Sequence, residues 1–184
     1  MALTESRTLP IGATAPDFAL VDTCTNHTVA REDFNGSPLL VAIICNHCPF
    51  VVHLLDSLVQ RAGEFASVGV STVAISSNDI QSYPQDGPDK MAQLASKRGF
   101  DFPYLFDETQ NVAKEFAAVC TPEFYLFDDE HALYYHGQWD SSRPGGGTAT
   151  GDDVAAAVKS LLADEPAPQN VRAAMGCSIK WASA

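Results

Sequence analysis

The clearest hydrophobic pattern in the chain is a short apolar run followed by an amphipathic stretch. Positions 39–44 read Leu-Leu-Val-Ala-Ile-Ile, without a polar residue, which is typical of a strand buried on both faces. Over 51–65 apolar residues recur at steps of three and four, which predicts a helix with one apolar stripe. A second β-branched run, 70–76, follows the glycine at position 69. This order predicts a right-handed βαβ unit with two parallel strands.

Weaker elements, separated by turn-forming residues, flank this unit. Before it, 15–20 and 28–29 are predicted to be extended, and a turn follows at 34–38. After it we expect, in order, a loop (79–89), helices (90–98 and 108–117), an antiparallel hairpin (123–127 and 132–136), an exposed loop (141–151) and a helix (152–163). We expect one α/β domain over 1–184, with its core at about 10–163 and a flexible tail at 164–184.

Composition and charge narrow the function classes. A chain of 184 residues with 46% hydrophobic content can bury a core without disulfide support. With 23 acidic and 11 basic residues the net charge is −12, which opposes binding to nucleic acid and to anionic membranes. The first residues lack the apolar run of a signal peptide, and no stretch of about 18 uncharged apolar residues follows. We therefore expect a soluble, cytoplasmic protein.

The cysteines carry the candidate chemistry. There are five, and Cys45 and Cys48 have CxxC spacing at the junction between the strand 39–44 and the helix 51–65. Free amide groups and the helix dipole stabilise a thiolate at such a position. We predict that Cys45 and Cys48 are a catalytic dithiol that cycles through a disulfide. His47 lies between them and is either a cation that supports the thiolate or a solvated turn residue.

Metal binding is the main alternative. Cys45, His47, Cys48 and His53 offer sulfur and imidazole ligands within nine residues, which suits copper or zinc. Structural zinc usually has four ligands in paired clusters, and the chain has no second CxxC or HxxxH motif. The alternative function is therefore a module that delivers copper or zinc. The leading hypothesis requires no metal and no organic cofactor, whereas a non-catalytic interaction domain would leave the CxxC unexplained.

Four short motifs carry a family resemblance. They are GATAPDFAL at 12–20, DFNG at 33–36, NHCPFV at 46–51 and GCSIKW at 176–181. The first two resemble the thioredoxin-like superfamily, and within it the proteins related to alkyl hydroperoxide reductase and thiol-specific antioxidant. The last two resemble a less characterised peroxiredoxin-like subfamily with a CNHCP motif. The resemblance implies a thioredoxin fold with a central mixed β-sheet flanked by helices and an N-terminal β extension of peroxiredoxin type.

The resemblance also implies supporting residues. Thr121 and Pro122 match the cis-proline loop that faces the dithiol in thioredoxins, where a proline leaves space for a substrate chain. Cys120 would then lie near the site as a spectator or as a third redox partner. Cys177 could return from the tail as a resolving thiol or be buried under Trp181. Arg143 is the candidate for the arginine that peroxiredoxins hold near the thiolate, with a solvated loop cation as the alternative.

The two parent families assign the dithiol differently. In a thioredoxin, Cys45 would attack and Cys48 would resolve. The peroxiredoxin motif P-x-x-x-T-x-x-C makes Cys48, which is followed by the expected Pro49, the peroxidatic residue. Cys45 then replaces the threonine that helps bind peroxide, and this predicts slow peroxide reduction. The resemblance implies a thiol-disulfide oxidoreductase with antioxidant, peroxide-reducing activity, a disulfide or peroxide substrate and a thioredoxin-like or other thiol reductant. The expected assembly is a homodimer.

Overall fold

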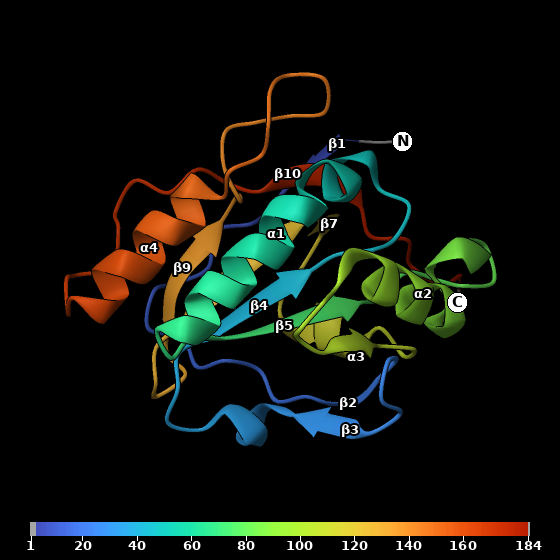
Figure 1. Ribbon diagram of the computed structural model, residues 1–184, viewed down its shortest axis with the longest axis horizontal. Coiled ribbons are helices and arrows are strands. Elements are labelled where there is room, and N and C mark those ends of the chain that lie inside the picture. Colours follow the sequence, from blue (N-terminus) through green and yellow to red (C-terminus); the bar gives the residue numbers. More distant parts are fainter. Residues whose placement is uncertain (1–2, 184) are drawn as a thin grey trace.

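A seven-stranded mixed sheet forms the centre of the computed structural model, which describes residues 3–183 (Figure 1). Its strand order is β3-β2-β6-β5-β4-β8-β9. The strands are β2 (Ala19–Asp22), β3 (Thr28–Ala30), β4 (Leu39–Ile43), β5 (Ser71–Ser76), β6 (Tyr104–Phe106), β8 (Glu123–Phe127) and β9 (Leu133–Gly137). Strands β4, β5 and β6 run parallel, and the remaining neighbours pair antiparallel. The predicted parallel pair, the hairpin and the mixed α/β sheet are confirmed.

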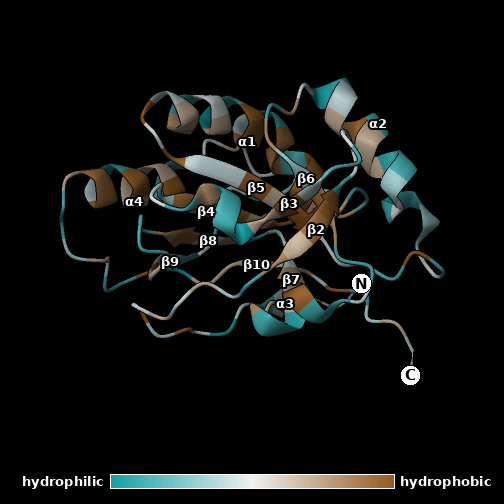
Figure 2. Cartoon of the chain, turned by 90° about the horizontal axis from the view of Figure 1, so that it is seen from below, coloured by the Kyte–Doolittle hydropathy of each residue, from teal (hydrophilic) through white to brown (hydrophobic). Residues whose placement is uncertain are grey.

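Helices cover both faces of this sheet. They are α1 (Pro49–Ser67), α2 (Pro88–Arg98), α3 (Asn111–Glu115) and α4 (Asp152–Leu162), with short 3-10 turns η1 (Arg31–Phe34) and η2 (Pro84–Asp86). Figure 2 shows α1, α2 and α4 on one side of the sheet and α3 on the other. The β2–β3 hairpin extends the sheet beyond β6, as the predicted N-terminal β extension requires. No helix within residues 3–183 is long and apolar enough to cross a bilayer.

Strand β4 divides the core into two layers. Because side chains alternate along a strand, Leu40 and Ala42 pack with the apolar stripe of α1. Leu39, Val41 and Ile43 pack into a second cluster on the opposite face, which includes Phe116 beside α3. The prediction that 39–44 is buried on both faces is confirmed. This central position holds the end of β4, and therefore the CxxC, in a rigid setting.

Some predicted boundaries are wrong for local reasons. Helix α3 is shorter than the predicted 108–117, because Gln110 has a left-handed φ of 62° before it and Ala117 one of 51° after it. Only the end of the predicted strand 15–20 is extended in the sheet, as part of β2.

A second, three-stranded sheet corrects the prediction of a flexible tail. Its order is β1-β10-β7, with β1 (Leu3–Glu5), β10 (Met175–Ser178) and β7 (Cys120–Thr121) all antiparallel. Gly176 makes the pairing feasible, because a Cβ there would overlap the Thr121 carbonyl oxygen. The segment that carries Cys177 is therefore an ordered strand that lies against the loop before Pro122.

Candidate active site

The two cysteines of the CxxC lie on either side of the turn from β4 into α1. Cys45 comes shortly after β4, Cys48 is the N-cap residue of α1 and Pro49 is its first helical residue. Proline suits this first position because its fixed φ is helical and no intrahelical amide bond is lost there. Cys45 is 1% exposed and Cys48 is 0% exposed, so the surrounding chain covers both sulfur atoms.

The surroundings of the two sulfur atoms favour a thiolate at Cys48. A hydrogen bond from the Cys45 thiol lowers the pKa of Cys48 well below its ordinary value, although burial opposes this change. The Cys177 thiol and the backbone N–H groups of Val51 and Cys177 lower it further. The same hydrogen bond to Cys48 raises the pKa of Cys45, and burial and the charge of Asp86 add to that effect. These contacts favour the thiolate at Cys48, at the helix N-terminus, with Cys45 as the neutral thiol beside it.

Thr121 lies against both thiols, in the segment that precedes Pro122. The Thr121–Pro122 peptide bond is cis. The Cys45 sulfur is 3.4 Å from the Thr121 hydroxyl oxygen, and the Cys48 thiol donates to the Thr121 carbonyl oxygen at 3.2 Å. The second contact is made by the protonated Cys48 and so works against thiolate formation. The structure therefore brings the predicted cis-proline loop and the dithiol together.

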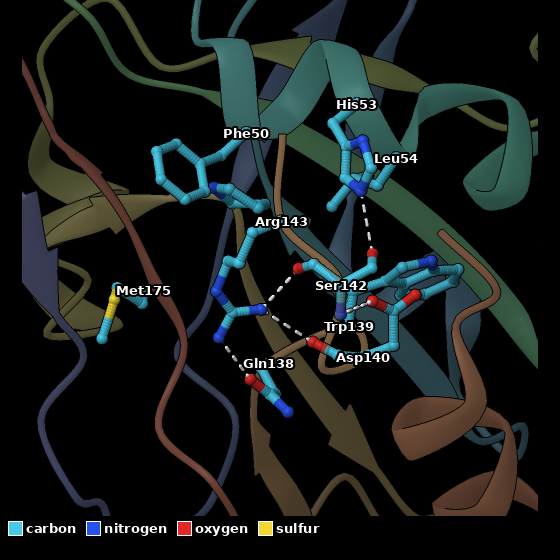
Figure 3. A pocket seen from close by; sticks show the side chains of 10 residues that line it. Phe50, His53, Leu54, Gln138, Trp139, Asp140, Ser142, Arg143 and Met175 are labelled. Carbon is cyan, nitrogen blue, oxygen red and sulfur yellow. Dashed lines mark hydrogen bonds between the residues drawn. The ribbon is translucent and has the colours of Figure 1, made fainter. Parts of the chain in front are cut away.

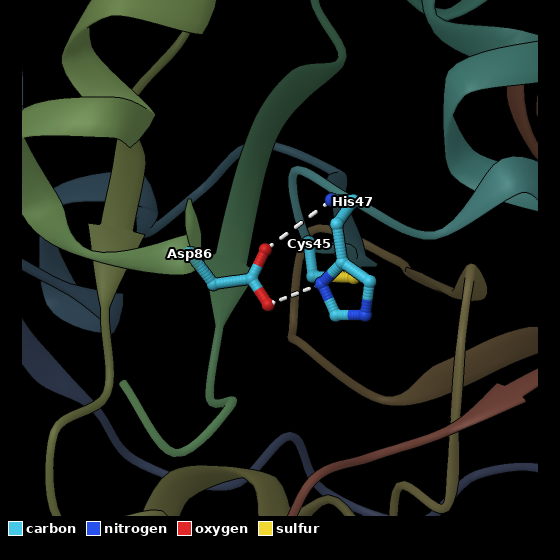
Figure 4. Close-up of side chains that lie close together, drawn as sticks. All are labelled: Cys45, His47 and Asp86. Carbon is cyan, nitrogen blue, oxygen red and sulfur yellow. Dashed lines mark hydrogen bonds and ion pairs between the residues drawn. The ribbon is translucent and has the colours of Figure 1, made fainter. Parts of the chain in front are cut away.

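His47 is oriented by a buried carboxylate rather than left in solvent. Its Nδ1 lies 2.6 Å from Asp86 Oδ2, and its backbone N–H donates to Asp86 Oδ1 at 3.3 Å (Figure 4). Its ring stacks on Tyr83 with 5.1 Å between the ring centroids. Asp86, which is 0% exposed, also accepts hydrogen bonds from Asn46 N and Asn78 Nδ2. The interpretation of His47 as a solvated turn residue is wrong.

Asp86 is the site residue that the sequence did not reveal. It lies in η2, inside the segment predicted as a loop, and no motif marks it. Only the tertiary fold places it near Cys45, because that proximity depends on how the loop after β5 returns to the end of β4.

A metal could use a different ligand set from the predicted one. One ligand atom each from Cys45, His47 and Asp86 lie within 4.8 Å of one another (Figure 4). His53 is not part of this group, and its Nε2 is 2.9 Å from the Ser142 hydroxyl. Thiolate, imidazole and carboxylate together suit zinc. Both oxygens of the Asp86 carboxylate already accept hydrogen bonds, so a metal would have to displace a donor.

The remaining buried cysteines surround the loop before Pro122. Cys177 pairs in register with Thr121, and burial followed by the hydrogen bond to Cys48 raises its pKa. Burial and then the charge of Glu123 raise the pKa of Cys120 above its ordinary value, and its sulfur lies 3.5 Å from Glu123 Oε2. At neutral pH both are therefore neutral thiols.

Glu123, directly after Pro122, forms a buried hydrogen-bonded pair with His136. Its Oε1 is 2.7 Å from His136 Nε2 and accepts a hydrogen bond from the Tyr125 hydroxyl. Although burial opposes ionisation, the hydrogen bonds from His136, the Val119 amide and Tyr125 hold the pKa of Glu123 below its ordinary value. This pair anchors the start of β8 and so supports the loop that contacts the thiols.

Arg143 bonds to its own segment. Its Nη1 donates to the carbonyl oxygens of Asp140 and Ser142, and its Nη2 donates to Gln138 Oε1 at 2.7 Å (Figure 3). It is half-buried and lines a pocket that Pro122 also borders. Because these bonds hold the loop, Arg143 is not a solvated loop cation, and its role near the thiolate stays a prediction.

Comparisons with known proteins found a matching family model and similar solved structures. The model of the AhpC/TSA family matches residues 11–136. An uncharacterized conserved protein from Geobacillus kaustophilus is 44% identical, with a TM-score of 0.97 over 100% of this chain and 98% of its own. A hypothetical protein from Sinorhizobium meliloti is 40% identical, with a TM-score of 0.95 over 98% and 100%.

A more distant structure supports the fold alone. The thioredoxin domain of a thiol-disulfide oxidoreductase from Bacteroides vulgatus is 18% identical, with a TM-score of 0.64 over 82% of this chain and 99% of that one. The predicted thioredoxin fold is thereby confirmed. No curated protein matches the chain. The CNHCP subfamily stays a prediction.

Proposed function

Because the chain belongs to the AhpC/TSA family, we propose that it is a thiol-dependent oxidoreductase in which Cys48 attacks and Cys45 resolves. The observation that supports this assignment is the position of Cys48 at the N-cap of α1, and the neighbouring Cys45 thiol lowers the pKa of Cys48 further. A thiolate is the reactive form of cysteine, and a neutral thiol beside it is ready to form the disulfide.

The same two sulfur atoms can process either class of substrate. With a disulfide, the Cys48 thiolate bonds to one sulfur and the other leaves as a thiolate; Cys45 then loses its proton, attacks Cys48 and expels the second thiol. With a peroxide, Cys48 takes one oxygen to become a sulfenic acid while the alcohol or water leaves, and Cys45 condenses with it and releases water. Both routes end in a Cys45–Cys48 disulfide. Two electrons from a thioredoxin-like or other thiol donor restore the dithiol.

Asp86 and His47 serve the resolving step. Cys45 must give up a proton as it attacks, and its raised pKa shows that this proton is held firmly. The Asp86 carboxylate and the His47 ring lie in the same group of atoms as the Cys45 sulfur and are proton acceptors. They accept the proton that Cys45 loses as it attacks. A cytoplasmic location and a homodimer remain predictions.

Stopped-flow oxidation tests the assignment. Reduced wild-type protein and the Cys45→Ser and Cys48→Ser variants are mixed with hydrogen peroxide or with a small disulfide, and Cys24→Ser serves as control because Cys24 is exposed and outside the site. We expect Cys48→Ser to abolish rapid oxidation by both reagents, and Cys45→Ser to retain the first step but accumulate sulfenic acid or mixed disulfide. Rapid oxidation that depends on Cys45 and survives in Cys48→Ser would refute the proposal.

The metal-delivery function has one supporting observation, the Cys45–His47–Asp86 group. It is the weaker candidate because Asp86 already accepts four hydrogen bonds, from the amides of Asn46 and His47, the His47 ring and Asn78. A metal would exchange these bonds for coordination. Zinc titration of the reduced protein distinguishes the two functions.

A further inference from the structure

A substrate that reaches Cys48 must lie beside Thr121, because the Cys48 sulfur touches the Thr121 carbonyl oxygen. An extended peptide binds most readily there by pairing with the exposed edge of a short strand. Strand β7 is such an edge, but in this protein it is already paired. Strand β10 runs antiparallel along it, with Cys177 opposite Thr121 and Ser178 opposite Cys120.

The contact between β10 and the loop is close and specific. Gly176 lies so near Thr121 and Pro122 that a Cβ would overlap the Thr121 carbonyl oxygen. The following residues continue the attachment: Ile179 N donates to Val119 O at 3.0 Å, and Lys180 N donates to Asn78 Oδ1 at 2.8 Å. Figure 1 shows β10 and β7 side by side near the start of α1. The strand therefore covers the side of the site from which a substrate chain would approach.

Cys177 lies beside Cys48 in this paired strand. It is the register partner of Thr121, and its side chain interacts with the thiolate of Cys48. Cys45, Cys48 and Cys177 also belong to one packed cluster. Cys48 is consequently flanked by two neutral thiols, one from its own turn and one from the C-terminal strand.

We propose that Cys177 is a second resolving thiol, which strand β10 delivers to Cys48 in the place that a substrate strand would take. This inference rests on the proposed role of Cys48 as the attacking thiolate. Strand β10 then has two roles. It shields the dithiol in the resting protein, and it provides an internal partner for oxidised Cys48.

The exchange needs no oxidant beyond the one that oxidises Cys48. From the Cys45–Cys48 disulfide, the Cys177 thiol loses its proton and its sulfur bonds to Cys48; the Cys45–Cys48 bond breaks and Cys45 takes up a proton as it leaves. From a Cys48 sulfenic acid, Cys177 forms the same Cys48–Cys177 bond and water leaves. The first route replaces one disulfide of the chain with another, so the protein is neither oxidised nor reduced. The second completes the two-electron reduction of a peroxide.

Disulfide mapping tests the chemistry. Wild type, Cys45→Ser, Cys45→Ala and Cys177→Ser are equilibrated with graded mixtures of reduced and oxidised glutathione, quenched in acid, alkylated and analysed by peptide mass spectrometry, with Cys24→Ser as the matched control. We expect a Cys48–Cys177 disulfide in both Cys45 variants, only the Cys45–Cys48 disulfide in Cys177→Ser, and the wild-type pattern in Cys24→Ser. A Cys48–glutathione adduct with alkylated Cys177 in both Cys45 variants would overturn the inference. Wild-type Cys48 that stays reduced throughout would instead overturn the proposed function.

Displacing strand β10 tests whether it shields Cys48. Gly176→Ala places a methyl group against the Thr121 carbonyl oxygen, whereas the control Gly63→Ala in α1 makes only an ordinary contact, 3.6 Å from Asp101 Oδ2. Alkylation of Cys48 by iodoacetamide is followed in each reduced protein by mass spectrometry, and a urea midpoint is recorded for each. We expect a several-fold faster alkylation in Gly176→Ala than in wild type or Gly63→Ala, with less Cys48–Cys177 disulfide on oxidation. Unchanged alkylation together with an unchanged disulfide yield would contradict the placement of β10 as a shield.

Discussion

The hydrogen bond from Cys45 to Cys48 makes a quantitative prediction. Cys45→Ala removes the thiol that lowers the pKa of Cys48 most strongly, while the Cys177 thiol and the amide of Val51 stay in place. A hydrogen bond to a charged group contributes about 1.5–3 kcal/mol. One pKa unit corresponds to about 1.4 kcal/mol. We therefore expect the pKa of Cys48 to rise by about 1–2 units in Cys45→Ala.

Ultraviolet absorbance of the thiolate measures this pKa, and it does not require a reagent to reach the buried sulfur. The titration is recorded for wild type, Cys45→Ala and Cys45→Ser, with Cys48→Ser to identify the signal. Because serine retains an O–H donor, Cys45→Ser should show a smaller rise than Cys45→Ala. The reasoning is refuted if Cys45→Ala titrates at the wild-type midpoint, or if the low-pH transition persists in Cys48→Ser.

The same pKa has a consequence for stability. The pKa of Cys48 is lower in the folded chain than in the unfolded chain, where a free cysteine has a pKa of about 8.5. The ionisation of Cys48 therefore stabilises the folded state fully above the unfolded-state pKa, and this contribution is lost as the pH falls through the folded-state pKa. We expect the difference in unfolding free energy between wild type and Cys48→Ser to grow across this window as the pH rises.

Three further predictions concern the residues around the dithiol. Asp86→Asn should lower the pKa of the resolving thiol by removing a negative charge, yet slow its attack several-fold by removing the proton acceptor; the lifetime of the trapped mixed disulfide measures this. Glu123→Gln should cost about 1–3 kcal/mol in urea unfolding, because an amide NH2 replaces one carboxylate oxygen and leaves buried donors around it without an acceptor. The exposed pair of the control Asp17→Asn contributes about 0–1 kcal/mol. Reduced protein should bind zinc weakly; any tight stoichiometric binding should be lost in His47→Ala and kept in His53→Ala, and the reverse would contradict the ligand group of the structure.

Much of the fold was readable from local patterns. The run 39–44 and the stripe over 51–65 encode their burial in residue type and spacing, and β4 and α1 follow them closely. Boundaries were less predictable where the backbone changes direction, as at Gln110, because no side-chain pattern marks a left-handed residue before a short helix. The N-terminal extension followed from the family motifs rather than from periodicity.

The sequence predicted only part of the candidate site. CxxC spacing after a buried strand predicted Cys45 and Cys48, and the family resemblance implied Thr121 and Pro122 beside them. The contacts of Arg143 could not be predicted, because a cation in a loop bonds to whichever oxygens the loop brings near it. Here those are the carbonyl oxygens of Asp140 and Ser142.

The sequence by itself determined which residues can do chemistry, because residue type and spacing are enough to identify a reactive pair of thiols at a strand-to-helix turn. Only the tertiary structure decided which groups surround the two sulfur atoms, and those groups favour the thiolate at Cys48. Asp86 reaches Cys45 through a returning loop, and Cys177 reaches Cys48 through a strand more than a hundred residues away along the chain. Both placements depend on backbone pairing and packing between distant segments, and such pairings leave no local periodicity in the sequence.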